Sequence, residues 1–280
     1  MTTSQRVKAR TFRALHEGPG AFVIPNPWDA GSARLLASLG FSALATTSAG
    51  VAFTLGRPDA HAAITRDDVL ANARAIVEAT DLPIAADLEA GFGDTPDEVA
   101  RTIRLAAEAG LVGGSVEDAT YDPDRPIREL SQAVERLAAA VEAARALPFP
   151  FVLTARAENF LFGRHDLDDT IRRLQAFEAA GADVLYAPGL PTLDSIRAVC
   201  ASVSKPVNVL IGPTGQACSV DELAAAGVRR ISLGSSLCRA ALGAMLRAAR
   251  EIKDSGTFTF TSDAIPFAEL NAFMASKTAI

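Results

Sequence analysis

One pattern repeats along this chain: a short apolar run, a polar or glycine-rich loop, an amphipathic helical segment, and then the next apolar run. The runs are apolar almost throughout, which is typical of parallel strands buried on both faces. Eight of them occur, at residues 22–26, 42–48, 82–89, 111–118, 149–157, 183–189, 205–212 and 228–235. Eight alternating strand and helix units in 280 residues predict an α/β protein with a (β/α)8 barrel. A doubly wound sheet is the main alternative, but neither a Gly-x-Gly-x-x-Gly motif after the first run nor a Walker A motif supports it.

Helix boundary signals lie between these runs. Thr95-Pro96-Asp97-Glu98 combines a capping box with proline at the first helical position, and Ser219 to Glu222 opens a second helix with a capping box. We also expect an N-terminal helix within about residues 1–20 and a C-terminal helical extension at about 257–280. No shift in composition marks a boundary, so residues 1–280 are predicted to form a single barrel domain with these flanking helices.

Composition excludes several classes of partner. Asp and Glu number 33 against 27 Lys and Arg, a formal charge of −6, which argues against DNA or an anionic membrane as partner. No apolar segment resembles a signal peptide, and none approaches the roughly 18 residues of a membrane span. Three cysteines about 20 residues apart, Cys200, Cys218 and Cys238, favour neither a disulfide framework nor a zinc site. We therefore expect a cytoplasmic protein with reduced thiols.

Polar residues gather where the predicted strands end, which is where (β/α)8 barrels carry their chemistry. These strand-end residues are Asn26, Trp28, Asp29, Thr47, Ser48, Ala49, Asp59, Asp87, Glu89, Glu117, Asp118, Arg156, Glu158 and, within the seventh run, Asn208. Carboxylates packed on one rim raise each other's pKa values, and a hard cation such as Mg²⁺ relieves that repulsion. Asp87 and Glu89 lie two apart on one strand and should point the same way. Arg156 should face them and bind a substrate carboxylate.

Structural roles compete with these functional ones. A salt-bridge network of Asp87, Glu89 and Glu117 with Arg156 explains the carboxylates without a metal. Asp29 is as well explained as the cap of a helix starting at Gly31. We expect Asp118 to be a loop charge or a strand-end hydrogen-bond partner rather than a ligand. Glu158 is expected to face solvent because Arg156 takes the inward direction two residues earlier. His61 and His165 lie in polar loops and are expected at the surface.

The strand ends resemble those of the isocitrate lyase/phosphoenolpyruvate mutase superfamily. The strongest match is Ala86-Asp87-Leu88-Glu89-Ala90-Gly91-Phe92-Gly93, which is similar to that family's metal-binding strand end. Leu55 to Asp59, Val116 to Asp118 and Thr154 to Arg156 add weaker matches at the expected places. The similarity runs from about Asn26 to about Gly256, which is most of the chain.

The resemblance implies a barrel whose last helix is exchanged between subunits, in a homodimer or a homotetramer. It implies Mg²⁺ (or Mn²⁺) on Asp87, with Asp59, Glu89 and Glu117 reached largely through waters. The substrate would be a 2-oxo acid, held by the backbone around Thr47, Ser48 and Ala49 and by Arg156. We count Arg156 and Glu117 as candidate catalytic residues, and Trp28 and Asn208 as further candidates for substrate binding.

Departures from the family pattern narrow the activity. Glu89 stands where the family has aspartate, so that carboxylate reaches one methylene further. Residues 119–126 lack the Lys-(Lys/Arg)-Cys-Gly-His loop that carries the acid/base cysteine of isocitrate and methylisocitrate lyases, which argues against both activities. Ala45 replaces an aromatic residue that packs on the substrate, and residues 187–189 replace the lyases' glutamate at the end of strand six. The lysine- and asparagine-bearing gating loop of the phosphonate enzymes is not evident either.

The sequence therefore predicts a Mg²⁺-dependent carbon–carbon lyase that acts on a small 2-oxo acid through an enolate-like intermediate, as oxaloacetate decarboxylases do. Two alternatives remain. One is a P–C bond enzyme, either a phosphonopyruvate hydrolase or a phosphoenolpyruvate mutase. The other is a catalytically weak protein that binds a 2-oxo acid.

Overall fold

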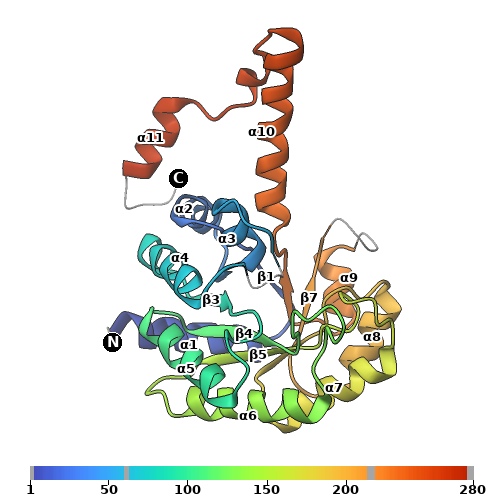
Figure 1. The fold of residues 1–280 in the computed structure, drawn as a ribbon. Coiled ribbons are helices and arrows are strands. Elements are labelled where there is room, and N and C mark those ends of the chain that lie inside the picture. Colours follow the sequence, from blue (N-terminus) through green and yellow to red (C-terminus); the bar gives the residue numbers. More distant parts are fainter. Residues whose placement is uncertain (1–2, 60–62, 213–217, 276–280) are drawn as a thin grey trace.

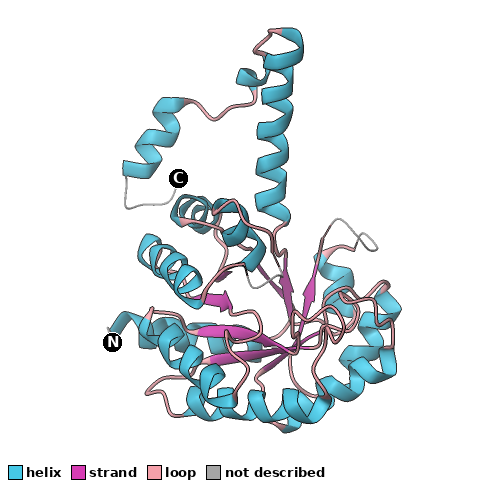
Figure 2. Ribbon diagram, in the orientation of Figure 1, coloured by secondary structure: helices cyan, strands magenta, loops and turns pink. Residues whose placement is uncertain are grey.

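Eight short parallel strands form the centre of the molecule (Figure 2). The computed structural model describes residues 3–59, 63–212 and 218–275. The strands are β1 (Phe22–Ile24), β2 (Leu44–Ala45), β3 (Ile84–Asp87), β4 (Gly113–Glu117), β5 (Val152–Arg156), β6 (Val184–Tyr186), β7 (Val207–Leu210) and β8 (Arg230–Ser232). Their order is β1-β8-β7-β6-β5-β4-β3-β2, and the amide of Ala45 bonds to the carbonyl of Pro25 across the remaining gap, at 3.1 Å. The predicted eight-stranded barrel is confirmed.

Helices surround this barrel (Figure 1). They are α1 (Thr3–Glu17), α2 (Ala30–Ser38), α3 (Ser48–Thr54), α4 (Arg66–Ala79), α5 (Pro96–Glu108), α6 (Leu130–Arg145), α7 (Leu167–Ala179), α8 (Leu193–Ser202), α9 (Val220–Ala225), α10 (Ser236–Ser255), the 3₁₀ helix η1 (Thr259–Ser262) and α11 (Phe267–Ala275). The predicted helices before and after the barrel are both present. The short α3 was not predicted, and it occupies the loop after β2.

Several helices begin where their capping residues place them. Thr95 and Ser219 form the predicted capping boxes of α5 and α9. Asp29 caps α2 by accepting a hydrogen bond from the Ser32 amide at 2.7 Å, and that helix begins at Ala30, one residue earlier than predicted. The structural interpretation of Asp29 is therefore confirmed.

The apolar core lies mainly between the strands and the surrounding helices. Its fully buried members include Ile76 on α4, Ile103 on α5, Leu153 on β5 and Phe177 on α7. Gly110, at the end of α5, has φ of +94°, and a Cβ there would lie 2.7 Å from Val77 Cγ1. This junction requires glycine for both reasons, because the positive φ disfavours a side chain and the close packing leaves no room for one.

The C-terminal region leaves the barrel. Helix α10 extends away from the strands, and the chain then turns back so that α11 lies beside α2 (Figure 1). Arg34 on α2 donates to the carbonyls of Phe273 and Met274 at 3.0 and 2.6 Å, which holds the end of α11. In α10 itself, Cys238 is the one buried residue. None of the described helices is long and apolar enough to cross a membrane.

Candidate functional site

All eight strands, or the turns that follow them, contribute to a cavity of about 60 Å³ inside the barrel. The polar residues around it are Asn26, Thr46, Thr47, Asp87, Ser115, Thr154, Arg156, Tyr186, Asn208, Arg230 and Ser232. Most of the other lining residues have small side chains or none, among them Ala45, Ala85 and Gly114. This volume has room for a few water-sized groups, so a small polar ligand fits its scale.

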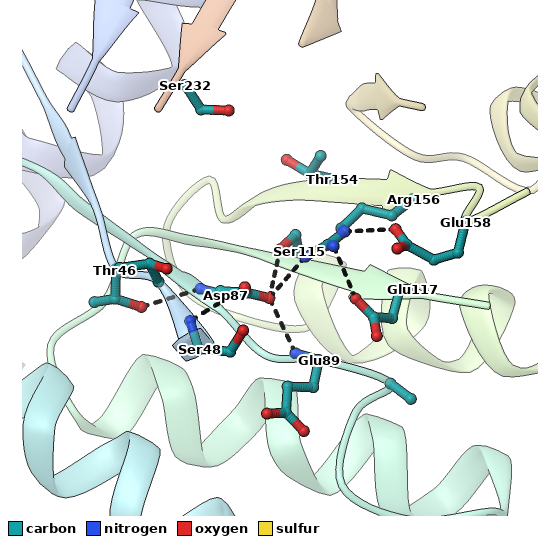
Figure 3. A network of polar contacts seen from close by, with 12 residues as sticks. Thr46, Ser48, Asp87, Glu89, Ser115, Glu117, Thr154, Arg156, Glu158 and Ser232 are labelled. Atoms are coloured by element: carbon teal, nitrogen blue, oxygen red, sulfur yellow. Dashed lines mark hydrogen bonds and ion pairs between the residues drawn. The ribbon is translucent and has the colours of Figure 1, made fainter. Parts of the chain in front are cut away.

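Asp87, the last residue of β3, is held from several sides (Figure 3). Its Oδ2 accepts a hydrogen bond from the amide of Ser48 at 3.3 Å. Its Oδ1 accepts from the Glu89 amide at 3.2 Å and from Arg156 Nη1 at 2.9 Å. Because α3 starts at Ser48, the exposed amide end of a helix points at this carboxylate.

Arg156, the last residue of β5, is surrounded by three carboxylates (Figure 3). Its Nη1 pairs with Asp87 at 2.9 Å, its Nη2 with Glu117 at 3.1 Å and its Nε with Glu158 at 2.9 Å. Burial opposes its charge, but these carboxylates outweigh burial and raise the pKa of Arg156 well above its usual value. The predicted salt-bridge network is therefore present for Asp87 and Glu117, but the third carboxylate paired with Arg156 is Glu158 and not Glu89.

The prediction for Glu158 is wrong. The residue is 2% exposed and its carboxylate points back to Arg156. The alternation of a strand does not apply to it, because β5 ends at Arg156 and the chain turns there. Asp118 is buried, accepts a hydrogen bond from the Glu158 amide at 2.9 Å and pairs with Arg173 at 3.1 Å. Its interpretation as a strand-end hydrogen-bond partner is confirmed.

Glu89 is buried beside Asp87, but it does not lie on the same strand as predicted. Strand β3 ends at Asp87, and Glu89 takes a left-handed backbone conformation with φ of +47°. Burial, followed by the charges of Asp87 and Asp59, raises the pKa of Glu89 to about 7. Burial also raises the pKa of Glu117 well above its usual value, although Arg156 opposes the shift. These carboxylates repel one another.

Tyr121, which the sequence analysis did not single out, joins the two glutamates. Its hydroxyl lies 3.1 Å from Glu89 Oε2 and 2.9 Å from Glu117 Oε1, and the amide of Ala90 donates to it at 3.3 Å. Tyr121 has φ of +62°, and it belongs to the loop in which the acid/base cysteine was missing. A loop tyrosine four residues after a strand-end glutamate is only a weak signal in the sequence.

The donor chemistry at this rim suits a hard cation. Asp59, Asp87, Glu89 and Glu117 offer carboxylate oxygens, and their mutual repulsion is what such an ion relieves. Within the described ranges, no three side chains converge as a ready-made metal cluster. Mg²⁺ keeps several waters and commonly binds through one or two carboxylates, so the arrangement fits Mg²⁺ better than a metal that needs a full protein cage.

The predicted substrate-binding residues divide into two groups. Thr47 and Asn208 line the cavity beside Asp87 and Arg156. Ser48 contributes the amide that reaches Asp87, and Ala49 lies buried in the first turn of α3. Trp28 is not among the lining residues. Its carbonyl accepts from Asn72 Nδ2 at 2.8 Å, and its Cβ packs close to Gly50.

The remaining predictions concern histidines. His165 is exposed, as expected, and His61 lies outside the described residues. His16, on α1, is buried instead, and it lies 3.3 Å from Arg230. Arg230 itself was not singled out, although two consecutive arginines at the start of a strand are a usable signal, because alternation turns one of them inward.

Comparison with known proteins places this site in a family. The family model described as phosphoenolpyruvate phosphomutase matches residues 12–253. The chain therefore belongs to the phosphoenolpyruvate mutase/isocitrate lyase superfamily, whose members include C–C lyases and P–C mutases acting on small carboxylates. A crystal structure from Burkholderia cenocepacia J2315, named as a candidate lyase/mutase, is 60% identical, covers 99% of each chain and superposes with a TM-score of 0.97.

Two of the relatives with named activities illustrate the range of the family. The 2-methylisocitrate lyase of Escherichia coli K12 is 32% identical over 71% of this chain and 68% of its own. The oxaloacetate decarboxylase of Bradyrhizobium diazoefficiens is 31% identical over 88% of this chain and 86% of its own. Because the two relatives are almost equally similar to this chain, sequence identity does not distinguish their activities, and the residues of the site must do so.

Proposed function

We propose that this protein is a Mg²⁺-dependent lyase (Mn²⁺ being the substitute) that cleaves a C–C bond beside the carbonyl of a small 2-oxo acid, in the manner of an oxaloacetate decarboxylase. One observation carries the proposal. Asp87 lies at the rim of a small polar cavity, between a helix amide end at Ser48 and Arg156, among buried carboxylates that repel one another. The decarboxylase relative supports the same reaction class.

The rim residues would have different roles in binding the metal ion. Asp87 would hold the ion directly, and Asp59, Glu89 and Glu117 would hold its waters. When bound, Mg²⁺ supplies a Lewis acid that polarises the 2-oxo oxygen and favours the enolate-like intermediate. The amides at the start of α3 add fixed dipoles near the same oxygen. Tyr121 keeps Glu89 and Glu117 in place.

Arg156 orients the acid. A guanidinium carries five N–H donors, and the three ion pairs engage one at each of its nitrogens. The second N–H on each of Nη1 and Nη2 is thus left for a substrate carboxylate. Since residues 119–126 contain no cysteine, the final proton would come from water or from another group of that loop. The absence of this cysteine also argues against the activity of the 2-methylisocitrate lyase relative.

A P–C bond enzyme is the second candidate, because the matching family model is described as a phosphoenolpyruvate phosphomutase. The same rim would then hold phosphonopyruvate. Phosphate released from phosphonopyruvate would indicate a hydrolase, and its conversion to phosphoenolpyruvate would indicate a mutase. The missing gating loop disfavours both.

Pyruvate formation tests the first candidate. The protein is incubated with oxaloacetate and Mg²⁺, with and without a chelator. The pyruvate formed is compared with that formed by Mg²⁺ and oxaloacetate without the protein. We expect chelator-sensitive pyruvate well above the background of the metal. If pyruvate stays at that background, the decarboxylase proposal fails. Tight binding of a 2-oxo acid without turnover would then identify a binding protein.

We further propose that α10 packs on a second copy of this chain, as the family resemblance implies. Helix α10 exposes Leu242, Met245 and Leu246, an apolar surface that its own barrel does not cover. Sedimentation velocity should show a homodimer or homotetramer. A monomer at micromolar concentration would contradict this assembly.

A further inference from the structure

Arg230 is a buried cation deep in the barrel, at the start of β8. It is 6% exposed, and each of its three nitrogens meets an uncharged partner. Its Nε donates to Asn208 Oδ1 at 2.8 Å, its Nη2 donates to Thr154 Oγ1 at 2.9 Å, and its Nη1 lies 3.3 Å from His16 Nε2. Among the residues that the structure describes, no carboxylate lies within ion-pairing distance of it.

His16 cannot balance this charge. Its Nδ1 lies 2.8 Å from the Phe12 carbonyl and therefore carries the proton, which leaves Nε2 to accept from Arg230. Burial, followed by the charge of Arg230, lowers the pKa of His16 to about 3, so the ring is neutral near pH 7. Burial also lowers the pKa of Arg230, to about 10, which still leaves the guanidinium charged. A full positive charge is thus buried, and none of the residues described supplies a counter-ion for it.

The two arginines of the cavity differ in this respect. Both Arg156 and Arg230 line it, but three carboxylates surround Arg156, whereas none in the described part of the chain pairs with Arg230. Burying an unpaired charge is costly, so a protein keeps one where something else compensates it. The compensating anion has a way to reach Arg230, because the cavity runs from Asp87 at the rim to Arg230.

The wall of the cavity leaves space for that anion. Barrel interiors are usually filled by branched residues such as Val, Ile and Leu. Here two of the lining residues are Ala45 and Ala85, beside the branched Ile24. Hydroxyls of Thr154 and Ser232 lie beside Arg230 and Asn208, and they add donors and acceptors for a small polar group.

We infer that Arg230, with Thr154, Asn208 and Ser232, forms a subsite inside the barrel that takes the second carboxylate of a dicarboxylic acid. This inference rests on the proposed function, since the rim holds the first carboxylate. Arg230 would then be the group that selects a small dianion, such as oxaloacetate, over a monocarboxylic 2-oxo acid. Arg230 is then a specificity residue, and it discriminates by charge at the end of the ligand remote from the metal.

Calorimetric binding in the presence of Mg²⁺ tests this with acids that do not decarboxylate. Malate and 2-hydroxybutyrate share a four-carbon skeleton and differ by a carboxylate against a methyl group. Oxalate is short and reports the rim alone. We expect the protein to bind malate at least 10-fold more tightly than 2-hydroxybutyrate, and Arg230→Gln to weaken malate binding roughly 10- to 100-fold, as expected for a lost charged hydrogen bond. The affinity of the Arg230→Gln variant for oxalate and for 2-hydroxybutyrate should change less than about 2-fold, since neither acid places a charge beside residue 230.

Arg230→Lys is the matched control, because it keeps the charge and should keep most of the preference for malate. Equal binding of malate and 2-hydroxybutyrate by the unmodified protein would overturn the inference without any variant. The inference would also be overturned if Arg230→Gln bound none of the three acids, or if Arg230→Lys lost the preference for malate. Arg230 would then be a purely structural residue. If the unmodified protein does not bind oxalate, the proposed function of the rim fails, and not the inference about Arg230.

Discussion

The hydroxyl of Tyr121 lies 2.9 Å from Oε1 of Glu117, although the two side chains come from a loop and from the end of a strand. The same hydroxyl lies 3.1 Å from Glu89. A phenol has one proton, so it donates to one of these carboxylates at a time. It therefore joins two buried glutamates, whose pKa values burial raises, without adding a charge of its own.

If the rim binds Mg²⁺ as proposed, replacing Tyr121 by phenylalanine should weaken that binding. The variant keeps the ring but loses the hydroxyl, and groups that orient metal-binding residues typically contribute 10- to 100-fold in affinity. We expect the apparent affinity for Mg²⁺ to fall roughly 10-fold, measured by titrating Mg²⁺ against oxalate binding or pyruvate formation. The thermal midpoint should change little. An unchanged Mg²⁺ titration would show that Tyr121 does not position the rim.

Asp87→Ala should abolish Mg²⁺-dependent ligand binding. Arg156 retains Glu117 and Glu158 in this variant, so the fold should persist and circular dichroism should be unchanged. Calorimetry with oxalate, with and without Mg²⁺, measures the effect. Asp122→Ala is a suitable control, because Asp122 lies in the neighbouring loop and its ion pair is with the exposed Arg125, at 3.4 Å. Binding that survives in Asp87→Ala would leave the carboxylates with a purely structural role.

Asp118→Ala should destabilise the fold by roughly 3 kcal/mol, because it removes the acceptor of the buried Glu158 amide and of Arg173. Urea unfolding measures this loss. Asp194→Ala is the matched control, since Asp194 pairs with Arg197 in the open, with its side chain 90% exposed. Exposed pairs contribute little, so this control should unfold almost as the original protein does. Equal losses in both variants would contradict the importance of burial.

His16 should make the protein less stable as the pH falls. Its folded pKa of about 3 is below its unfolded value of 6.5, so the unfolded chain binds the extra proton between these values. The stability that neutral His16 provides is complete above pH 6.5 and is lost as the pH falls towards 3. By pH 5 the loss is about 2 kcal/mol.

The comparison variant is His16→Gln, which cannot titrate. Other acidic groups contribute alike to both proteins, so the difference between their free energies of unfolding isolates the histidine. That difference should shift by about 2 kcal/mol between pH 7 and pH 5, against the original protein. A difference that is constant with pH would mean that His16 takes up its proton as readily in the folded protein as in the unfolded chain.

The barrel was predictable because its signals are local. Each strand lies within one of the eight apolar runs, and capping at Asp29 and Thr95 depends on residues three positions apart. The pairing of Asp87 with Arg156 was also predictable, since parallel strands end at one rim. Position along a strand and the spacing of apolar residues carry this information.

What the sequence could not predict depends on where strands stop and loops turn. Glu158 was assigned to solvent by alternation, but its strand had already ended. Glu89 leaves the strand through a left-handed turn, and Tyr121 reaches it from 32 residues away. Local alternation predicts that either Arg229 or Arg230 turns inward, and only the register that pairs Arg230 with Phe22 and Asn208 decides between them. These are long-range relationships that local patterns do not encode.

Because small residues line the inside of the barrel, ligand binding and the stability of the fold depend on different sets of residues. Ala45 and Ala85 contribute little apolar burial, so the stability of the molecule comes mainly from the outer layer, where Ile103 and Phe177 pack between strands and helices. Exchanging an inner residue for another small one therefore alters the ligand far more than it alters the fold. Such a barrel can acquire a new substrate without first losing its structure, which gives a physical basis for one scaffold serving many reactions.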